Sequence, residues 1–192
     1  MNDLIFRQVR ILDGSGGAEF IGDVSVREGR INEVGAVTEG LAPGGREISA
    51  EGAVLCPGLI DTHAHDDGAF FRHPGMEFKL SQGVTTVVSG NCGFSAIPAD
   101  PTKDSVAASG GILAGLEGKF TDLDGYYAAA LARQPAINNM MLVGHNTVRS
   151  LVMGDSKSAP NDLQLQEMQR HVTHALEPVS YTHLTLPTSR SV

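Results

Sequence analysis

Strand-like segments alternate with helix-like segments along most of this 192-residue chain, and this order restricts the fold more than any other feature. Three β-branched or apolar runs that turn polar at their ends are found in 58–65, 84–94 and 136–149. Segments with helical patterns separate and follow them, at 76–83, 120–134 and 161–177. The expected N-caps are Thr121 or Asp122 for the second of these helices and Asn161 for the third. Because parallel strands need a crossover between them, the alternation predicts an α/β fold with a mainly parallel sheet.

A different pattern occupies the first 57 residues. Short strand-like runs are split by glycine, and between residues 23 and 34 apolar Val24, Val26, Ile31 and Val34 interleave with charged residues. The letters "EGR" at 28–30 sit where a hairpin would turn. We therefore expect a separate small antiparallel sheet over residues 1–57.

Composition excludes several classes of partner. The chain has 19% charged and 41% hydrophobic residues, as a soluble globular protein does, and its net charge is -8. A negative surface disfavours nucleic acids and anionic membranes, so a small-molecule substrate is expected. No apolar run approaches the roughly 18 residues of a membrane span, and the start lacks the pattern of a signal peptide, which predicts a cytoplasmic location.

Two segments fit neither pattern. Residues 98–120 are rich in Pro, Gly, Ala and Ser and are long for a plain connection, so they are expected to form an inserted lid or a mobile linker. The tail 178–192 follows a helix that stops at Glu177 without a glycine cap. Its "SYTHLTLPT" resembles translated adapter DNA, so it is interpreted as non-native and excluded from the fold.

Histidine and cysteine side chains gather where two of the predicted strands turn polar. On a strand, residues i and i+2 share a face, so Asp61, His63 and His65 are expected in one row. Cys92 occupies the equivalent place on the next strand. Imidazole and thiolate suit a borderline cation such as zinc, and neighbouring carboxyl ends of parallel strands are where sites are built. The pattern predicts a zinc site.

A structural interpretation of the same residues stays open. A single buried His or Cys is usually a packed core residue, and a bare H-x-H pattern is weak evidence for a metal. The metal hypothesis is favoured by the joint occurrence of H-x-H after "PGLID" and of "GNCG" after a β-branched run.

Three motifs in order carry a family resemblance. "CPGLIDTHAHDD" resembles the first barrel strand of the amidohydrolase superfamily. "GVTTVVSGNCGFSAIP" and "LVGHNTVRSLVMG" resemble its N-acyl-D-amino-acid deacylase (D-aminoacylase) branch. The similarity runs from about residue 3 to residue 177 and so covers nearly all of the chain outside the tail.

The resemblance implies a fold and a set of site residues. A small β-sandwich portion, here 1–57, would precede the first strands and helices of a (β/α)₈ TIM-like barrel, here 58–177 and incomplete. His63 and His65 would be paired metal ligands, and Cys92 would ligate zinc where many relatives use a carboxylated lysine. His145 and Arg149 would lie at the end of the third strand, where site-lining and structural support are equally open roles.

The resemblance also implies an activity and shows what is missing. Zinc lowers the pKa of bound water to about 7 and polarises a carbonyl, so the implied reaction is hydrolysis of N-acyl-D-amino acids to a carboxylate and a D-amino acid. A complete barrel takes about 250 residues. The aspartate that serves as general base is expected beyond the end of this chain, and Asp61 is interpreted as a hydrogen-bonding residue. The chain alone is therefore expected to be truncated and inactive.

Two alternatives remain. The first is another amidohydrolase that acts on cyclic amides, such as a hydantoinase or dihydropyrimidinase, but these typically use the bridging lysine, and Cys92 favours the deacylase branch. The second is a non-catalytic fragment that binds metal weakly through His63, His65 and Cys92. The tail at 178–192 favours this hypothesis for the 192-residue chain itself.

Overall fold

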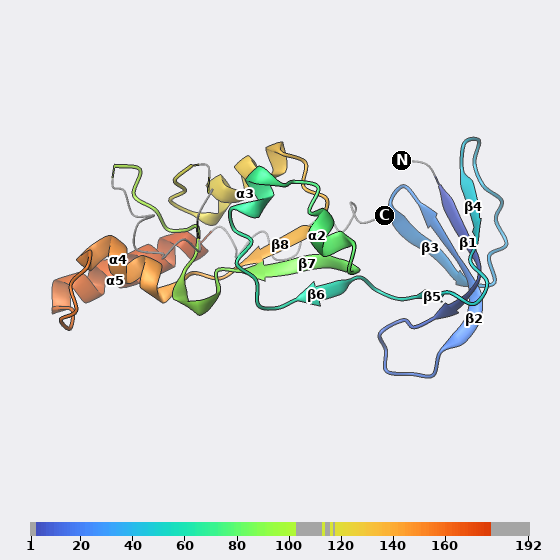
Figure 1. Cartoon of the computed structure of the whole chain (residues 1–192), viewed down its shortest axis with the longest axis horizontal. Helices are drawn as coiled ribbons and strands as arrows, with labels where there is room; N and C mark the ends of the chain where they lie inside the picture. The colour runs from blue at the N-terminus through green and yellow to red at the C-terminus, as the bar shows by residue number, and fades with distance from the viewer. Residues whose placement is uncertain (1–2, 103–112, 114–115, 117, 178–192) are drawn as a thin grey trace. The chain divides into compact units, whose positions relative to one another are not determined.

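The computed structural model describes residues 3–102, 113, 116 and 118–177 and divides after Gly58 into two compact units (Figure 1). The predicted tail at 178–192 and most of the predicted lid or linker at 98–120 lie outside the described residues. Within the part of the chain that is described, no helix is long and apolar enough to cross a membrane.

The first unit is a five-stranded sheet with the order β3-β2-β1-β4, in which β5 also pairs with β1. Its strands are β1 (Leu4–Ile11), β2 (Phe20–Arg27), β3 (Arg30–Gly35), β4 (Arg46–Ser49) and β5 (Val54–Leu55). The alternating residues form the expected hairpin of β2 and β3. Its turn residues Glu28 and Gly29 have φ of 50° and 76°, the positive values that tight hairpin turns require.

The expectation of a purely antiparallel sheet was wrong. β4 and β5 both run parallel to β1. After β3 the chain crosses in residues 36–45 to the free edge of β1. There β4 runs in the same direction as β1, so the sheet is mixed. Gly52, with φ of 81°, lies in the turn that separates β4 from β5.

One face of this sheet holds a small core in which Val9, Ile11 and Val24 are buried together. A bulge interrupts the pairing of β1 with β2 between Phe6 and Val9. The bulge residue Gln8 turns its N–H out of the ladder, and the Asp23 carboxylate accepts it at 2.9 Å.

The second unit contains a parallel three-stranded sheet in the order β6-β7-β8, which confirms the α/β prediction. The strands are β6 (Leu59–Asp61), β7 (Val84–Ser89) and β8 (Asn138–Met141). The helices are α1 (Ala69–Arg72), α2 (Glu77–Leu80), α3 (Leu123–Ala132), α4 (His145–Met153) and α5 (Asp162–Leu176). Figure 1 shows α2 and α3 on one side of this sheet.

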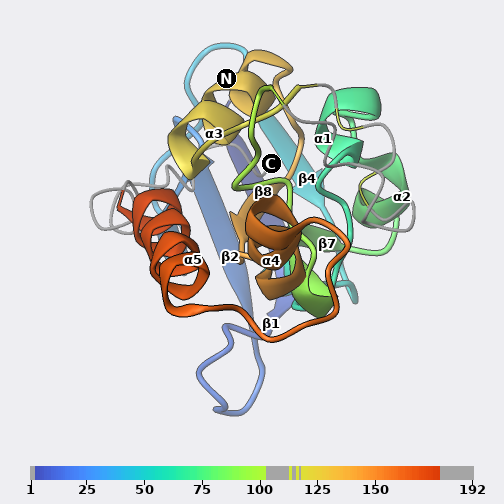
Figure 2. The same cartoon turned by 90° about the vertical axis from the view of Figure 1, so that its left-hand side faces the viewer.

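Side-chain caps fix where two of these helices begin. Asp122, one of two predicted caps for α3, accepts the backbone N–H of Gly125 at 2.8 Å. Asn161, the predicted cap of α5, accepts from the N–H of Gln164, whose own side chain accepts from the N–H of Asn161. This reciprocal capping box confirms the prediction. α5 packs beside α4 (Figure 2).

An aromatic cluster lies in the core between the sheet and its helices. Phe71, Phe120 and Tyr126 have ring centroids 5.5 Å apart in each pair, and Tyr126 is fully buried. By contrast, Leu59 and Ile60 on the edge strand β6 are 55% and 61% exposed. The sheet is therefore covered on one face and open along β6 in the described part.

Candidate metal centre

The two ligand-bearing segments leave their strands earlier than predicted. β6 ends at Asp61 and β7 at Ser89, so His63 and His65 lie in the loop after β6. Cys92 lies in the short 3₁₀ turn η1 (Asn91–Gly93) that follows β7. The prediction of a single row of strand residues was wrong, because the backbone turns before the first histidine. The strand ends nevertheless lie side by side, since Asp61 pairs with Val87 in the parallel ladder.

These loops bring the three predicted ligands together. His63, His65 and Cys92 each offer a donor atom, and these atoms lie within 4.8 Å of one another. His63 Nε2 is 3.2 Å from Cys92 Sγ, and the two imidazole rings are 5.6 Å apart at 70° to each other. His63 and Cys92 are exposed and His65 is half-buried, so the group opens to solvent.

The donor set fits a zinc ion. Two imidazoles and one thiolate are ligands that zinc prefers, and bonds of about 2.0–2.3 Å would bring such donors to a common point after a small contraction. His65 Nδ1 is buried and has no hydrogen-bond partner among the described residues, an arrangement that is costly unless a ligand supplies the partner. His63, His65 and Cys92 would hold the ion, and the ion would supply a Lewis acid for a carbonyl group.

The loop that carries Cys92 depends on left-handed backbone. Gly90, Cys92 and Gly93 have φ of 81°, 55° and 81°. These values end β7 and reverse the chain, which is why the predicted strand does not reach Cys92. At Gly90 a Cβ atom would lie 2.2 Å from the carbonyl oxygen of Leu142, so glycine is required by space as well as by conformation.

The start of α4 packs directly against this loop. A Cβ atom on Gly144 would lie 2.4 Å from the carbonyl oxygen of Gly93, and one on Gly93 would lie 2.7 Å from Asn146 Nδ2. Asn146 Nδ2 also donates to the Cys92 carbonyl at 3.3 Å. The glycines on both sides of the contact thus allow the start of α4 to hold the Cys92 backbone in place.

Hydroxyl groups join the same two segments further along. Ser95 N donates to Thr147 Oγ1 at 2.9 Å, and Gly144 N donates to Ser95 Oγ at 2.8 Å. Ser95 is buried and Thr147 lies in the first turn of α4. These bonds satisfy backbone donors that would otherwise be buried without partners, and they fix the far end of the Cys92 loop.

Asp67 is a buried carboxylate that the sequence reasoning did not assign. Its Oδ1 accepts from Ala96 N at 2.9 Å and its Oδ2 from Gly90 N at 3.4 Å, so it spans the Cys92 loop. Tyr126 donates its hydroxyl to the Asp67 carbonyl at 2.9 Å. Burial raises the pKa of Asp67 above its usual value, and this effect is larger than the opposite effect of the backbone N–H groups that donate to the carboxylate. Its place beside the histidines was the only sequence signal.

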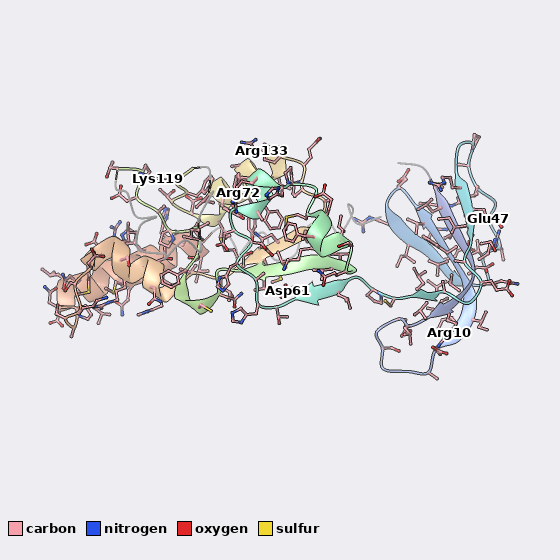
Figure 3. All side chains as sticks on the ribbon, in the orientation of Figure 1. Arg10, Glu47, Asp61, Arg72, Lys119 and Arg133 are labelled. Carbon is pink, nitrogen blue, oxygen red and sulfur yellow. The ribbon has the colours of Figure 1, made fainter. Side chains whose placement is uncertain are left out.

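Asp61 supports the histidine segment from the strand side. Its Oδ1 accepts from the backbone N–H of His63 at 3.1 Å, and its Oδ2 is 2.7 Å from Lys79 Nζ. The hydrogen bond from Lys79 and the one from His63 lower the pKa of this carboxyl, which keeps it ionised at neutral pH. Figure 3 shows Asp61 at β6.

His145 and Arg149 lie on α4 and not at the end of a strand as predicted. His145 is the exposed first residue of the helix and does not belong to the group of three donors. Arg149 Nη2 donates to the carbonyl oxygens of Ser156 and Ser158 at 2.8 and 2.7 Å. The guanidinium thereby fastens the segment that follows α4.

Comparison with known proteins gives the same assignment as the motifs. A family model described as "Amidohydrolase family" matches residues 46–186. The N-acyl-D-glutamate deacylase of Alcaligenes xylosoxydans xylosoxydans is 40% identical over 175 residues, which are 91% of this chain and 35% of that protein. The chain thus spans about a third of the length of this curated relative.

Solved structures agree. The crystal structure of N-acyl-D-glutamate deacylase from Bordetella bronchiseptica, complexed with zinc and a phosphonate inhibitor, matches with a TM-score of 0.80 at 40% identity, over 92% of this chain and 36% of that one. The crystal structure of D-aminoacylase matches with a TM-score of 0.73 at 34% identity, over 92% and 37%. The resemblance read from the three motifs is confirmed, and the chain belongs to the amidohydrolase family.

Proposed function

We propose that this chain supplies the first metal-binding part of a zinc-dependent hydrolase that cleaves N-acyl-D-amino acids into a carboxylate and a D-amino acid. The observation that carries the proposal is the group formed by His63, His65 and Cys92, whose donor atoms lie within 4.8 Å of one another. The relatives that support it are named as deacylases of N-acyl-D-glutamate and N-acyl-D-aspartate, and the similar crystal structure of the Bordetella bronchiseptica N-acyl-D-glutamate deacylase contains zinc.

In this proposal His63, His65 and Cys92 hold the metal. A zinc ion in such a site polarises an amide carbonyl and lowers the pKa of a water molecule. The other described residues orient the ligands. Asp61 holds the backbone of His63, and Asp67 holds the loop of Cys92 through Gly90 and Ala96.

The whole protein would be longer than the described part. We propose that β6, β7 and β8 are the first three strands of a (β/α)₈ barrel over 58–177, and that 1–57 contributes to a β-sandwich, with 178–192 as a non-native tail. The general-base aspartate would come from a part of the barrel outside this chain. The small-molecule substrate and the cytoplasmic location remain predictions from the sequence.

This incomplete barrel leads to an expectation about the chain alone. Without the general base, the 192-residue chain is expected to release no D-amino acid from N-acetyl-D-glutamate in the presence of zinc. Hydrolysis by the purified chain would show that the site is complete. The cyclic-amide alternative is not favoured, because the structures that match with TM-scores of 0.80 and 0.73 are deacylases of the N-acyl-amino-acid class.

Metal binding tests the site itself. Cobalt(II) bound to a thiolate gives a ligand-to-metal absorption band, so its titration into the chain reports on Cys92 directly. Cys92→Ser is expected to remove the band and to weaken binding by about 10-fold or more, as loss of a ligand or of its support does. Cys56→Ser is the matched control, because Cys56 is the other cysteine and is also exposed and free.

A chimera tests the reaction. Residues 1–177 would be joined to the remaining two-thirds of the Alcaligenes N-acyl-D-glutamate deacylase, and release of D-glutamate from the N-acetyl compound would be measured. Activity on the D-substrate that is lost with Cys92→Ser is the expected result. A folded, zinc-loaded chimera without activity would contradict the proposed function.

A further inference from the structure

Lys79 reaches both sides of the segment that carries the two histidines. Its Nζ lies 2.7 Å from Asp61 Oδ2 and 3.0 Å from Asp66 Oδ2. Asp61 is the last residue of β6, and Asp66 directly follows His65. One ammonium group from α2 therefore joins the residues on either side of the histidine pair.

This double ion pair is more shielded than an ordinary surface pair. The side chains of Lys79 and Asp66 are each 17% exposed, and that of Asp61 is 31% exposed. Two neighbouring carboxylates repel each other unless a cation lies between them, and the repulsion is stronger where water is partly excluded. Without the ammonium group, the two ends of the segment would be pushed apart.

Lys79 is connected to the first histidine through the carboxylate of Asp61. Asp61 uses Oδ2 for Lys79 and Oδ1 for the backbone N–H of His63, at 3.1 Å. The ion pair thereby fixes the carboxylate plane, and the carboxylate fixes the His63 backbone. At the other end, Asp66 is covalently joined to His65, so its position limits where the second imidazole can lie.

The backbone of α2 is itself well anchored. Met76, which precedes the helix, is fully buried, and its carbonyl oxygen accepts from Lys79 N at 2.9 Å. α2 also packs on β7, the strand that leads to Cys92. The ammonium group is consequently held by the same core that supports the two ligand loops.

We propose that Lys79 is a positioning residue that presents His63 and His65 to the metal by clamping Asp61 and Asp66. The inference rests on the proposed metal site and adds a residue that touches no ligand atom. A merely structural ion pair would contribute to the free energy of unfolding, whereas a positioning residue changes the metal affinity of the folded chain. These two quantities separate the roles.

The test is a cobalt(II) titration of the 192-residue chain and its variants, followed through the thiolate absorption band, with thermal unfolding measured in parallel. Lys79→Met keeps most of the unbranched apolar side chain and removes its charge, and it is expected to weaken cobalt binding by about 10-fold or more. Lys79→Arg keeps the charge and is expected to retain most of the affinity. Arg10→Met, which removes the 2.8 Å ion pair with Glu19 in the first unit, is the control and should bind as the parent chain does.

The cobalt affinities of the parent chain and its variants distinguish a positioning role of Lys79 from a structural one. Weaker binding by folded Lys79→Met, with recovery in Lys79→Arg, supports the positioning role. Equal binding by the parent and Lys79→Met, with only a lower unfolding temperature, overturns it while leaving the metal site intact. If Lys79→Met does not fold, Asp66→Asn takes its place, and unchanged affinity in that variant overturns the inference. A folded parent chain that binds no cobalt overturns the metal site as well.

Discussion

Cys92 carries its thiol on a backbone that residues with a side chain seldom adopt. Its φ of 55° lies in the left-handed region, which costs a non-glycine residue of this kind about 1 kcal/mol or more. Gly90 and Gly93 take the same region without cost on either side. The thiol is thus turned toward His63 at the expense of local backbone stability, an arrangement that fits a binding site better than a packing position.

The approach of Gly144 to this loop gives a prediction for a single residue. Its φ and ψ of -76° and 123° suit any residue, so Gly144→Ala tests space alone. An added Cβ would lie 2.4 Å from the Gly93 carbonyl oxygen, and we expect a loss of about 1–3 kcal/mol in the free energy of unfolding by urea, together with weaker cobalt binding.

Gly40→Ala is the matched control for this variant. No heavy atom lies within 4 Å of a Cβ at Gly40, so its free energy of unfolding should change by less than about 0.5 kcal/mol or rise slightly. Equal effects of the two alanines would mean that α4 does not constrain the Cys92 loop.

At the scale of elements, helix starts were easier to predict than strand ends. Asn161 and Asp122 cap their helices as expected, because an N-cap depends on the side chain and three following residues. β6 and β7 stop short of the predicted ends, and α4 begins at His145 where a strand end was expected. The end of β7 and the start of α4 lie where Gly90 and Gly144 approach distant backbone, and a local pattern does not contain these contacts.

The capping box of α5 gives an element-scale prediction. Asn161→Ala removes the acceptor for Gln164 N, which lies 2.9 Å away, and should lower the free energy of unfolding by about 1 kcal/mol. Asn161→Asp keeps an acceptor and a favourable charge at the helix start, so it should restore most of the loss. Urea unfolding followed by far-UV circular dichroism measures both. A neutral alanine variant would show that α5 is held by packing alone.

For the whole molecule, the grouping of the three donor residues was more predictable than the topology of the sheet in the first unit. The H-x-H spacing and the cysteine after a β-branched run singled out His63, His65 and Cys92 because ligand chemistry limits which residues can serve, and the structure brings their donor atoms within 4.8 Å of one another. Lys79 and Asp67 were missed, since a lysine or an aspartate has many ordinary roles. Only the folded chain shows that Lys79 pairs with two carboxylates and that Asp67 is buried. The parallel pairing of β4 with β1 was missed for the same reason, because it joins segments about 40 residues apart.

The exposed edge of the second unit leads to a prediction about association. β6 is an edge strand within the described residues and carries Ile60 at 61% exposure, which invites pairing with another copy. Ile60→Lys should raise the protein concentration at which light scattering increases. Leu163→Lys, on α5 at 76% exposure, removes a comparable apolar side chain from a helix and should have the smaller effect. A larger effect of Leu163→Lys than of Ile60→Lys would show that the surface responsible for association lies on α5.

The separation of the proposed ligands along the chain has a consequence for folding. His63 and Cys92 are 29 positions apart, so an ion held by both closes a loop much as a disulfide bond does. In chain-entropy terms, closing a loop of that length is worth about 3–4 kcal/mol against the unfolded chain. Since both ligands precede the third strand, such a cross-link would become available during synthesis before β8 has left the ribosome. The metal would then stabilise the pairing of β6 with β7 early in folding, in addition to its role in the site.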